Sequence, residues 1–495
     1  MFHVGSCAIV GAENRSKQII LRQAPRKRVP AEMRSKMSVT GKLYDKSKID
    51  RETMLYPPSA LFALLIPIVV EQLLNSFMGM ADTMMVSNVG SQAISAVSLV
   101  DSVNNLVVQV FAAMATGASI ICSQYLGSGK REEANRAARQ VVLTVLVISV
   151  ALTVFGLITR KGLLALIFGQ VEPEVMRQAQ SYFLVTVLSY PFLALFNAGS
   201  AFFRAGGNSR LPMTVSVISN VLNVAGNAIL IFGLGMGVVG AAVSTLISRI
   251  FCTAVIFFLL RRERQAIVFR DYLTLRPELS LIGKILAIGI PAGVENGMFQ
   301  FGKLAIQSTV STMGTEAIAA QAMANILEMV NGIFGVGVGI GLMTMVGQAI
   351  GAGRVEEAKY YIVKCTRIGL AGILVSCLAV WGITRPVLWL AGMEEGSALL
   401  CFHMVTAITV AKPLFWAFSF IPAYGMRAAG DVRFSMITAT ITMWGLRVAL
   451  CIFLVKTFQM GPMAVWYGMF ADWAVRGLIF FCRFRSGRWL KNKVI

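Results

Sequence analysis

Twelve apolar segments, each long enough to cross a lipid bilayer, constrain what this chain can fold into. A helix needs roughly 20 apolar residues to cross the hydrocarbon core, and segments of that length recur along most of the sequence. With 56% hydrophobic residues, 14% charged residues and a mean hydropathy of +0.70, the composition fits a polytopic membrane protein. We therefore expect an all-α integral membrane protein with twelve transmembrane helices. The segments lie near residues 58–86, 93–125, 137–160, 175–203, 210–233, 237–261, 283–312, 316–349, 360–385, 396–426, 433–455 and 462–482.

The second half of the sequence repeats the first. An offset of 224 residues pairs Pro67 with Pro291, and it pairs residues 124–134 with 348–358, which share the pattern Gln-x-x-Gly-x-Gly followed by Glu-Glu-Ala. Each half holds six apolar segments, so the two halves have the same orientation in the membrane. Parallel repeats of this kind belong to transporters that rock two lobes about a central site. We expect two six-helix lobes.

These features divide the chain into five parts. Residues 1–56 are expected to form a basic, disordered cytoplasmic tail, and residues 483–495 a second basic cytoplasmic tail. The first lobe takes residues 57–262 and the second lobe residues 283–482. The cytoplasmic linker 263–282 joins them.

The net charge of +21 is explained by where the basic residues lie. With the N-terminus inside the cell, 35 of the 45 Lys and Arg residues fall in the tails and in loops on the cytoplasmic side. The outer loops hold only Arg160, Lys161, Arg385 and Lys456. Cytoplasmic loops carry an excess of Lys and Arg, so both termini are expected inside. The positive charge is therefore explained without binding to nucleic acid. We expect a monomer whose partners are membrane lipids and small organic molecules.

The first apolar segment carries two carboxylates, Glu71 and Asp82. Eleven residues at about 100° each place them on one face of a helix, about 16 Å apart. Acids inside a membrane are costly and usually face a bundle interior or a water-filled cavity. They indicate either an ion or substrate pathway or an acid held by a neighbouring helix for packing. Pro67 removes a backbone hydrogen bond and predicts a hinge in the same helix.

Two amides, Asn223 and Asn227, stand four residues apart in the fifth segment. Their oxygens face the same way on a helix and suit a hard cation. The alternative is that they form interhelical hydrogen bonds, as Asn commonly does in membranes.

Most other charged residues inside the segments are expected to serve structure. Asp472 and Arg476 are four residues apart and should pair with each other. Glu295 and Lys303 share one segment, where they either pair across two turns or each line a cavity.

Residues for catalysis or tight metal binding are scarce. The chain has two His, and its eight Cys are scattered without a C-x-x-C pattern, so neither a zinc site nor a disulfide framework is expected. The glycines in residues 124–134 lack the spacing of a phosphate-binding loop. We expect no enzyme activity and no cofactor.

Four motifs occur together: Gly79-Met-Ala-Asp82-Thr-Met-Met, Gln124-x-x-Gly127-x-Gly129, Arg204-Ala-Gly-Gly207 and Asn223-x-x-x-Asn227. With these motifs the chain resembles the MATE family (multidrug and toxic compound extrusion) over roughly residues 55–485, in its bacterial NorM-like and DinF-like members. The resemblance implies an antiporter of the bacterial plasma membrane. It would export organic, often cationic, compounds in exchange for Na⁺ or H⁺.

The resemblance also implies a coupling site. The first-helix aspartate of the family corresponds to Asp82, and the first-lobe cation site of DinF-type members corresponds to Asn223, Asn227 and Thr245. Asn227 stands where that pattern has Asp, so one charge is absent.

For the substrate cavity we expect Glu71, Asn75, Glu295 and Gln300, because the repeat places the two glutamates at equivalent heights. The second-lobe acids of NorM-type members are absent. Their positions are occupied by Phe299 and Trp416, so no cation site of that type is expected.

Three alternatives stay open at the level of the sequence. A lipid-linked oligosaccharide flippase of the same superfamily would favour a larger basic cavity, whereas the central candidates here are acidic. An intramembrane enzyme is disfavoured because no nucleophile motif or His/Cys/Asp cluster occurs. The third alternative is a channel.

Overall fold

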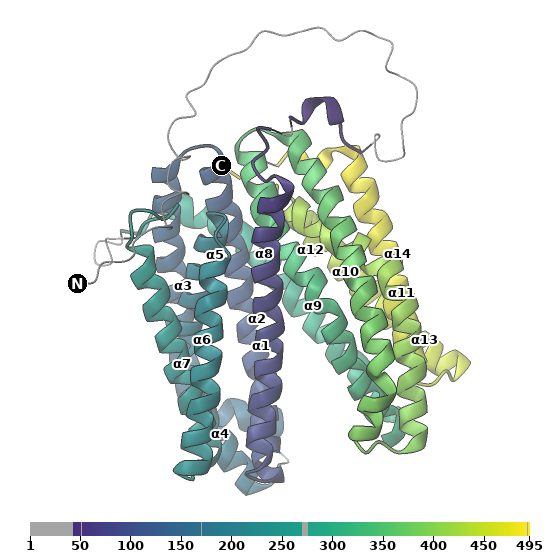
Figure 1. Cartoon of the computed structure of the whole chain (residues 1–495). Coiled ribbons are helices and arrows are strands. Elements are labelled where there is room, and N and C mark those ends of the chain that lie inside the picture. The colour runs from purple at the N-terminus through teal and green to yellow at the C-terminus, as the bar shows by residue number, and fades with distance from the viewer. Residues whose placement is uncertain (1–42, 51, 170, 270–275, 493) are drawn as a thin grey trace, which may run out of the picture. The chain divides into compact units, whose positions relative to one another are not determined.

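The computed structural model describes residues 43–50, 52–169, 171–269, 276–492 and 494–495, and the regular structure among them is helical (Figure 1). The first half contains α1 (Pro58–Ser87), α2 (Ser91–Gly127), α3 (Arg131–Phe168), α4 (Pro173–Leu188), α5 (Tyr190–Ala205), α6 (Arg210–Asn227) and α7 (Gly237–Leu260). The second half contains α8 (Leu279–Val310), α9 (Thr315–Gly351), α10 (Val355–Leu390), α11 (Glu395–Ala428), α12 (Val432–Ile441), α13 (Ala449–Phe458) and α14 (Met463–Ser486). Two π-helical turns occur. The first, η3 (Ala228–Gly233), continues α6, and the second, η5 (Thr442–Val448), joins α12 to α13.

These helices confirm the twelve-span fold. In the described residues, ten helices are long and apolar enough to cross a membrane when η3 and η5 are counted with their neighbours. An eleventh span consists of α4 and α5, which are bent by 43° at their junction. The twelfth place belongs to α14, which is less apolar because it carries Asp472 and Arg476.

The internal repeat is visible in the backbone as well as in the sequence. Gly90 and Gly314 stand at the N-caps of α2 and α9, with φ of 136° and 95°. Residues with a Cβ are strained at such angles, whereas glycine is not. The equivalent helices of the two lobes therefore begin with the same turn.

At one end of the bundle, the first helix of each lobe begins within the hydrophobic core of the other lobe. Leu61, Leu64 and Ile68, at the start of α1, are buried in the hydrophobic core of the second lobe. Leu281 and Ile285, at the start of α8, are buried in the core of the first lobe. Each lobe is thus held to the other by the entry helix of its partner.

The same end is closed where α2 and α9 cross. A Cβ added at Gly127 would collide with the backbone of Gln348, and one added at Gly351 would collide with the backbone of Gln124. The glycines of the repeated Gln-x-x-Gly pattern therefore allow two helices to cross at backbone distance. This explains the pattern as a packing device.

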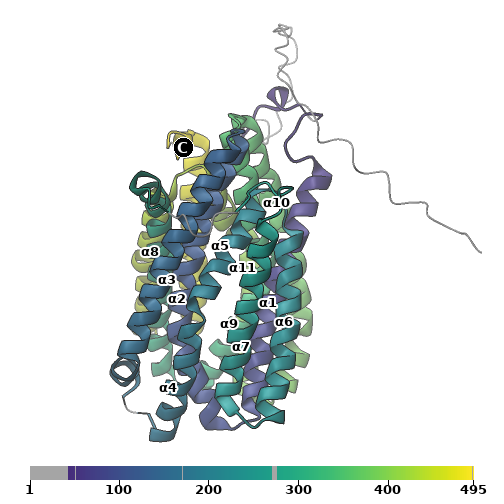
Figure 2. The same ribbon diagram turned by 90° about the vertical axis from the view of Figure 1, so that its left-hand side faces the viewer.

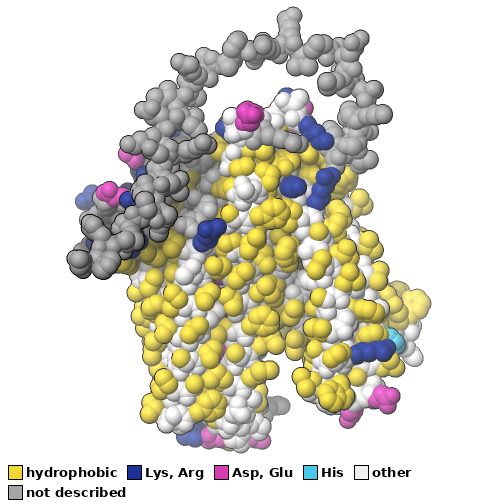
Figure 3. All heavy atoms as spheres, viewed as in Figure 1, with side chains coloured by type: hydrophobic (Ala, Val, Ile, Leu, Met, Phe, Trp, Pro, Cys, Tyr) yellow, Lys and Arg dark blue, Asp and Glu magenta, His cyan; other side chains and the backbone are white. Residues whose placement is uncertain are grey.

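At the other end of the helices the lobes separate. Figure 3 shows a hollow between them at the lower edge, away from the C-terminal end of the chain. Figure 2, in which the first lobe faces the viewer, shows its helices as long rods that run between the two ends. The surface over these rods is predominantly apolar (Figure 3), as a membrane-embedded surface requires.

The segment before α1 differs from the expected disordered tail. The backbone N–H of Tyr56 donates to the Tyr361 hydroxyl at 2.9 Å, and Arg354 Nη1 donates to the carbonyl of Thr53 at 2.6 Å. Glu357 accepts a further bond from the backbone N–H of Leu55. These partners on and beside α10 fix residues 52–56, while residues 1–42 of the expected tail lie outside the described residues.

Candidate functional site

Three helices of the first lobe bring the four expected coupling residues together. Asp82 comes from α1, Asn223 and Asn227 from α6, and Thr245 from α7. Asn227 Nδ2 donates to Asp82 Oδ1 at 2.6 Å. With the amide of Asn223 oriented to satisfy both its ends, its nitrogen donates to Asp82 Oδ1 at 2.8 Å and its oxygen accepts from the Thr245 hydroxyl at 3.1 Å.

Close packing of α6 on α7 sets this geometry. Gly226 stands next to Asn227, and a Cβ added there would collide with the Ser244 hydroxyl. That hydroxyl donates to the carbonyl of Asn223 at 2.8 Å. The glycine and the serine thus hold the two amides beside Thr245.

The cluster has the chemistry of a site for a proton or a hard cation. Asp82 supplies one carboxylate, and Asn223 and Thr245 supply neutral oxygens. Asn227 is fully buried, and its Oδ1 has no hydrogen-bond partner among the described residues. An unpartnered buried oxygen is costly, so a bound cation would satisfy it. One carboxylate among three neutral residues would let Na⁺ and H⁺ compete for a single charge.

A second polar cluster of the first lobe was not expected as a unit. Asp101 accepts from the Asn104 amide at 3.3 Å, and the Asn104 oxygen accepts from the Tyr190 hydroxyl at 2.7 Å. Arg249, one turn after Thr245, donates to Ser189 Oγ at 2.5 Å. Asp101 and Asn104 lie one turn apart on α2, whereas Tyr190 and Arg249 come from other helices, so no spacing in the sequence connects the whole cluster.

Glu71 and Glu295 form equivalent ion pairs. Glu71 lies 3.3 Å from the guanidinium of Arg204, and Glu295 lies 3.5 Å from that of Arg427. A serine hydroxyl also donates to Glu295, from Ser435 at 3.2 Å. Both glutamates are thus neutralised by the arginines of the repeated loop motif.

A cavity of about 960 Å³ lies between the lobes. Its wall is made by residues of α1, α2, α3, α8, α9, α11, α14 and η5. Of the expected cavity residues, Gln300 is in the wall, whereas Glu71, Asn75 and Glu295 are not among the lining residues. Phe299 and Trp416 also belong to the wall.

The charged residues of the wall come from the second lobe. They are Lys303, Glu328 and Arg447. Glu328 pairs with Lys412 at 2.5 Å. No pattern in the sequence predicts that these charges share one location, because they lie on different helices.

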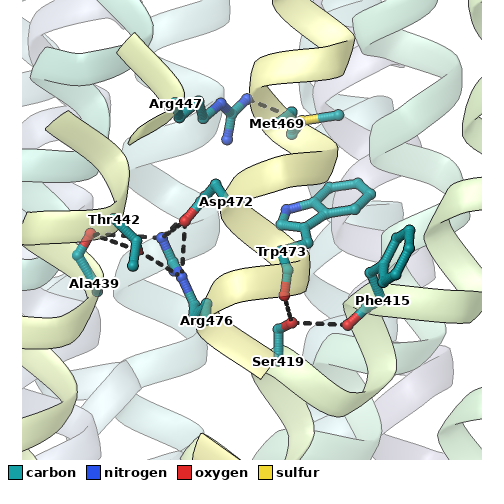
Figure 4. A network of polar contacts seen from close by, with 9 residues as sticks. All are labelled: Phe415, Ser419, Ala439, Thr442, Arg447, Met469, Asp472, Trp473 and Arg476. Carbon is teal, nitrogen blue, oxygen red and sulfur yellow. Dashed lines mark hydrogen bonds and ion pairs between the residues drawn. The ribbon is translucent and has the colours of Figure 1, made fainter. Parts of the chain in front are cut away.

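The pairing expected for Asp472 and Arg476 is confirmed. Arg476 Nη2 donates to both carboxylate oxygens of Asp472, at 2.8 and 3.0 Å (Figure 4). The pair is buried and is therefore a structural element of α14.

The comparisons with known proteins agree on one family. The MatE family model matches residues 67–229 and 291–453, so the second match begins 224 residues after the first. The "Uncharacterized transporter YisQ" of Bacillus subtilis (strain 168) is 28% identical over 457 residues, which cover 90% of this chain and 99% of the relative. The "Probable multidrug resistance protein NorM" of Thermotoga maritima is 27% identical over 442 residues, covering 88% and 94%. A crystal structure of MATE in the straight conformation has a TM-score of 0.81 at 21% identity, covering 86% of this chain and 95% of that chain.

Since the two family matches span well over half of the chain, it belongs to the MatE family of multidrug efflux transporters. The expected family is confirmed. The chain is a multi-pass membrane transporter built from two repeated lobes.

Proposed function

We propose that this chain is a secondary antiporter that exports small organic compounds in exchange for Na⁺ or H⁺, with Asp82 as the coupling group. The observation that carries the proposal is the Asp82 cluster. It places one carboxylate among Asn223, Asn227 and Thr245 inside the first lobe, with a buried oxygen left unpartnered. Ionisable residues inside a membrane protein typically mark ion pathways.

Helix α1 provides a direct connection between the coupling group and the cavity. Gln72 and Ser76 of α1 line the cavity, and Asp82 follows six residues later on the same helix. A change in the position of α1 when Asp82 exchanges a proton or a Na⁺ ion would therefore change the cavity wall. Pro67 is buried within α1, and we propose it as the point where the helix bends.

We place the protein in the bacterial plasma membrane with both termini in the cytoplasm. The positive-inside rule supports this orientation, since the linker between the lobes and the C-terminal tail are basic. The closed crossing of α2 and α9 then faces the cytoplasm, and the hollow in Figure 3 faces outward. We propose a monomer, because one chain builds both the coupling site and the cavity.

The family resemblance implies substrates that are often cationic, and glutamates in the cavity wall would attract such substrates. Glu71 and Glu295 are instead paired with Arg204 and Arg427. We therefore propose export of small organic compounds without restricting them to cations.

The test is dye transport by the purified chain in proteoliposomes, with a Na⁺ gradient and a pH gradient imposed separately. Rhodamine 123, a cation, and carboxyfluorescein, an anion, serve as cargo. Transport of either dye that depends on one of the gradients is the expected result. A transport rate that is the same with and without each gradient would contradict antiport.

The lipid-linked oligosaccharide flippase stays the second candidate, because it would favour a basic cavity, and Lys303 and Arg447 are in this wall. A flippase would move a fluorescent polyprenyl diphosphate across liposomes and would leave both dyes in place. That result would favour it over drug export.

A further inference from the structure

The cavity contains a buried arginine, Arg447, whose charge has no acidic partner among the described residues. Arg447 is 6% exposed, and its Nη2 donates to the thioether sulfur of Met469 at 2.9 Å, a weak acceptor. Its Nε has no hydrogen-bond partner among the described residues. Figure 4 shows why the neighbouring acid is not available: Asp472 is already bonded through both oxygens to Arg476. A buried arginine normally requires a full set of acceptors.

A second cation faces the same place from another helix. Lys303 of α8 is exposed and lines the cavity, and no ion pair among the described residues includes it. Its Nζ lies 5.0 Å from the centre of the Phe299 ring, and the Arg447 guanidinium lies 5.5 Å from the same centre. Both positive groups thus lie against the same aromatic ring of the wall.

The negative charge of the wall is already neutralised. Glu328 is the one carboxylate among the described lining residues, and Lys412 Nζ lies 2.5 Å from its Oε1. Lys412 is completely buried and also donates to the Glu328 backbone carbonyl at 2.7 Å. Because Lys412 balances the charge of Glu328, Lys303 and Arg447 give the cavity wall a net positive charge.

A column of aromatic rings runs along the cavity. Trp416, Phe420 and Tyr424 lie one turn apart on α11, and all three line the cavity. The first two rings are stacked, with centres 4.8 Å apart and planes 19° apart. Gly335 and Gly339 of α9 make room for the column, because a Cβ at either position would collide with the ring of Trp416 or Tyr424.

We propose that this cavity binds organic anions that carry a flat aromatic ring. The anionic group lies between Lys303 and Arg447, where it supplies the missing acceptors, and the ring packs along the aromatic column. Charge-assisted bonds to a guanidinium are about twice as strong as neutral ones, and stacked or edge-to-face aromatic contacts add to the affinity. The inference relies on the proposed export function only for the fate of the bound anion, since binding can be measured without transport.

The test is fluorescence anisotropy with the purified full-length chain in detergent. Carboxyfluorescein and rhodamine 123 share a xanthene ring and differ in charge, so they separate the charge requirement from the ring requirement. We expect carboxyfluorescein to bind at least about tenfold more tightly than rhodamine 123, a difference of about 1.4 kcal/mol.

Variants locate the binding site. Lys303→Gln and Arg447→Gln should each weaken carboxyfluorescein binding about tenfold or more, because each removes one charge from a desolvated contact. Neither variant should weaken binding of the cation rhodamine 123. Lys303 is exposed, so its variant tests the proposal even if the variant of buried Arg447 misfolds. The matched control is Lys456→Gln, which removes an exposed lysine of α13 that is not in the cavity wall and should change nothing.

Tighter binding of rhodamine 123, or carboxyfluorescein binding that survives Lys303→Gln, would overturn the proposal. Displacement of the dye by farnesyl diphosphate but not by 1-naphthalenesulfonate would also overturn it, in favour of a lipid diphosphate. If the anion binds as expected but no gradient drives its transport, the cavity assignment holds and the antiport function fails.

Discussion

Gln124 and Gln348, which are equivalent in the internal repeat, make reciprocal hydrogen bonds between the lobes. Gln124 Nε2 donates to the carbonyl of Ala428 at 2.7 Å, and Gln348 Nε2 donates to the carbonyl of Ala205 at 2.6 Å. Each acceptor belongs to the last turn of a helix of the other lobe, where carbonyls lack an intrahelical partner. Together with the glycine crossing, the two bonds close one end of the transporter.

We expect Gln124→Ala and Gln348→Ala to weaken this closed end. Each variant leaves a buried carbonyl without its partner, at a cost of about 1–3 kcal/mol. Spin labels at Lys130 and Val355, which follow the crossing helices, should then show an added population at longer distance. The measurement is pulsed electron spin resonance in a cysteine-free background.

The matched control for both variants is Gln92→Ala. Gln92 is an exposed residue of α2 at the opposite end, where it donates to Glu172 at 3.3 Å. Its variant should leave the label distances unchanged. Unchanged distances in all three variants would show that the reciprocal bonds do not hold the lobes together.

The glycine crossing predicts a stability effect. Gly351→Ala would force a methyl group against the backbone of Gln124, which cannot move aside, so we expect a loss of about 1–3 kcal/mol. Gly162→Ala, within α3 and with no atom within 4 Å of the added Cβ, should be neutral or stabilising by up to about 1 kcal/mol. Thermal unfolding of the purified variants in detergent measures both. Equal melting temperatures for the two variants would contradict the claim that the crossing of α2 and α9 requires glycine at position 351.

Glu71→Gln should reduce stability and should reduce the transport of all cargo to a similar extent. The change leaves the charge of Arg204, whose side chain is 14% exposed, without its partner, and breaking a buried pair typically costs about 3–5 kcal/mol. Thermal unfolding and transport of both dyes check this expectation. The double variant Glu71→Gln/Arg204→Gln should recover part of the lost stability. If the variant instead lost only the transport of cations and kept its stability, Glu71 would have to be assigned to the substrate pathway.

The orientation predicts which engineered cysteines react from outside the cell. Ser91→Cys and Lys456→Cys should be labelled in intact cells by a membrane-impermeant maleimide, and Arg264→Cys should not. All three positions are exposed, so a failure to react cannot be explained by burial of the side chain. Labelling at position 264 in intact cells would overturn the proposed orientation.

The sequence could predict the fold almost completely, because most of the spans are recognisable from their length and hydropathy. The repeat offset of 224 residues also located Gly127 and Gly351 at equivalent positions. The four coupling residues were found through motif resemblance and do lie together. Their role stays a prediction.

The sequence could not predict which charges neutralise each other across helices. Glu71 and Arg204 are far apart along the chain, and only the folded α1 and α5 bring them together. In the same way, Lys303 and Arg447 belong to different helices, and only the folded chain brings both of them to the ring of Phe299. An apolar segment shows where a charge is buried, but tertiary packing decides what the charge faces.

The most direct test of the account is gradient-driven efflux by Asp82→Asn in proteoliposomes. The change removes the one carboxylate of the coupling cluster at nearly constant volume, so the protein should insert and fold while efflux driven by Na⁺ or pH gradients is abolished. Asp101→Asn makes the same chemical change in the neighbouring cluster and should keep gradient-driven efflux. If Asp82→Asn exports dye at the wild-type rate under both gradients, Asp82 is not the coupling group and the central claim fails.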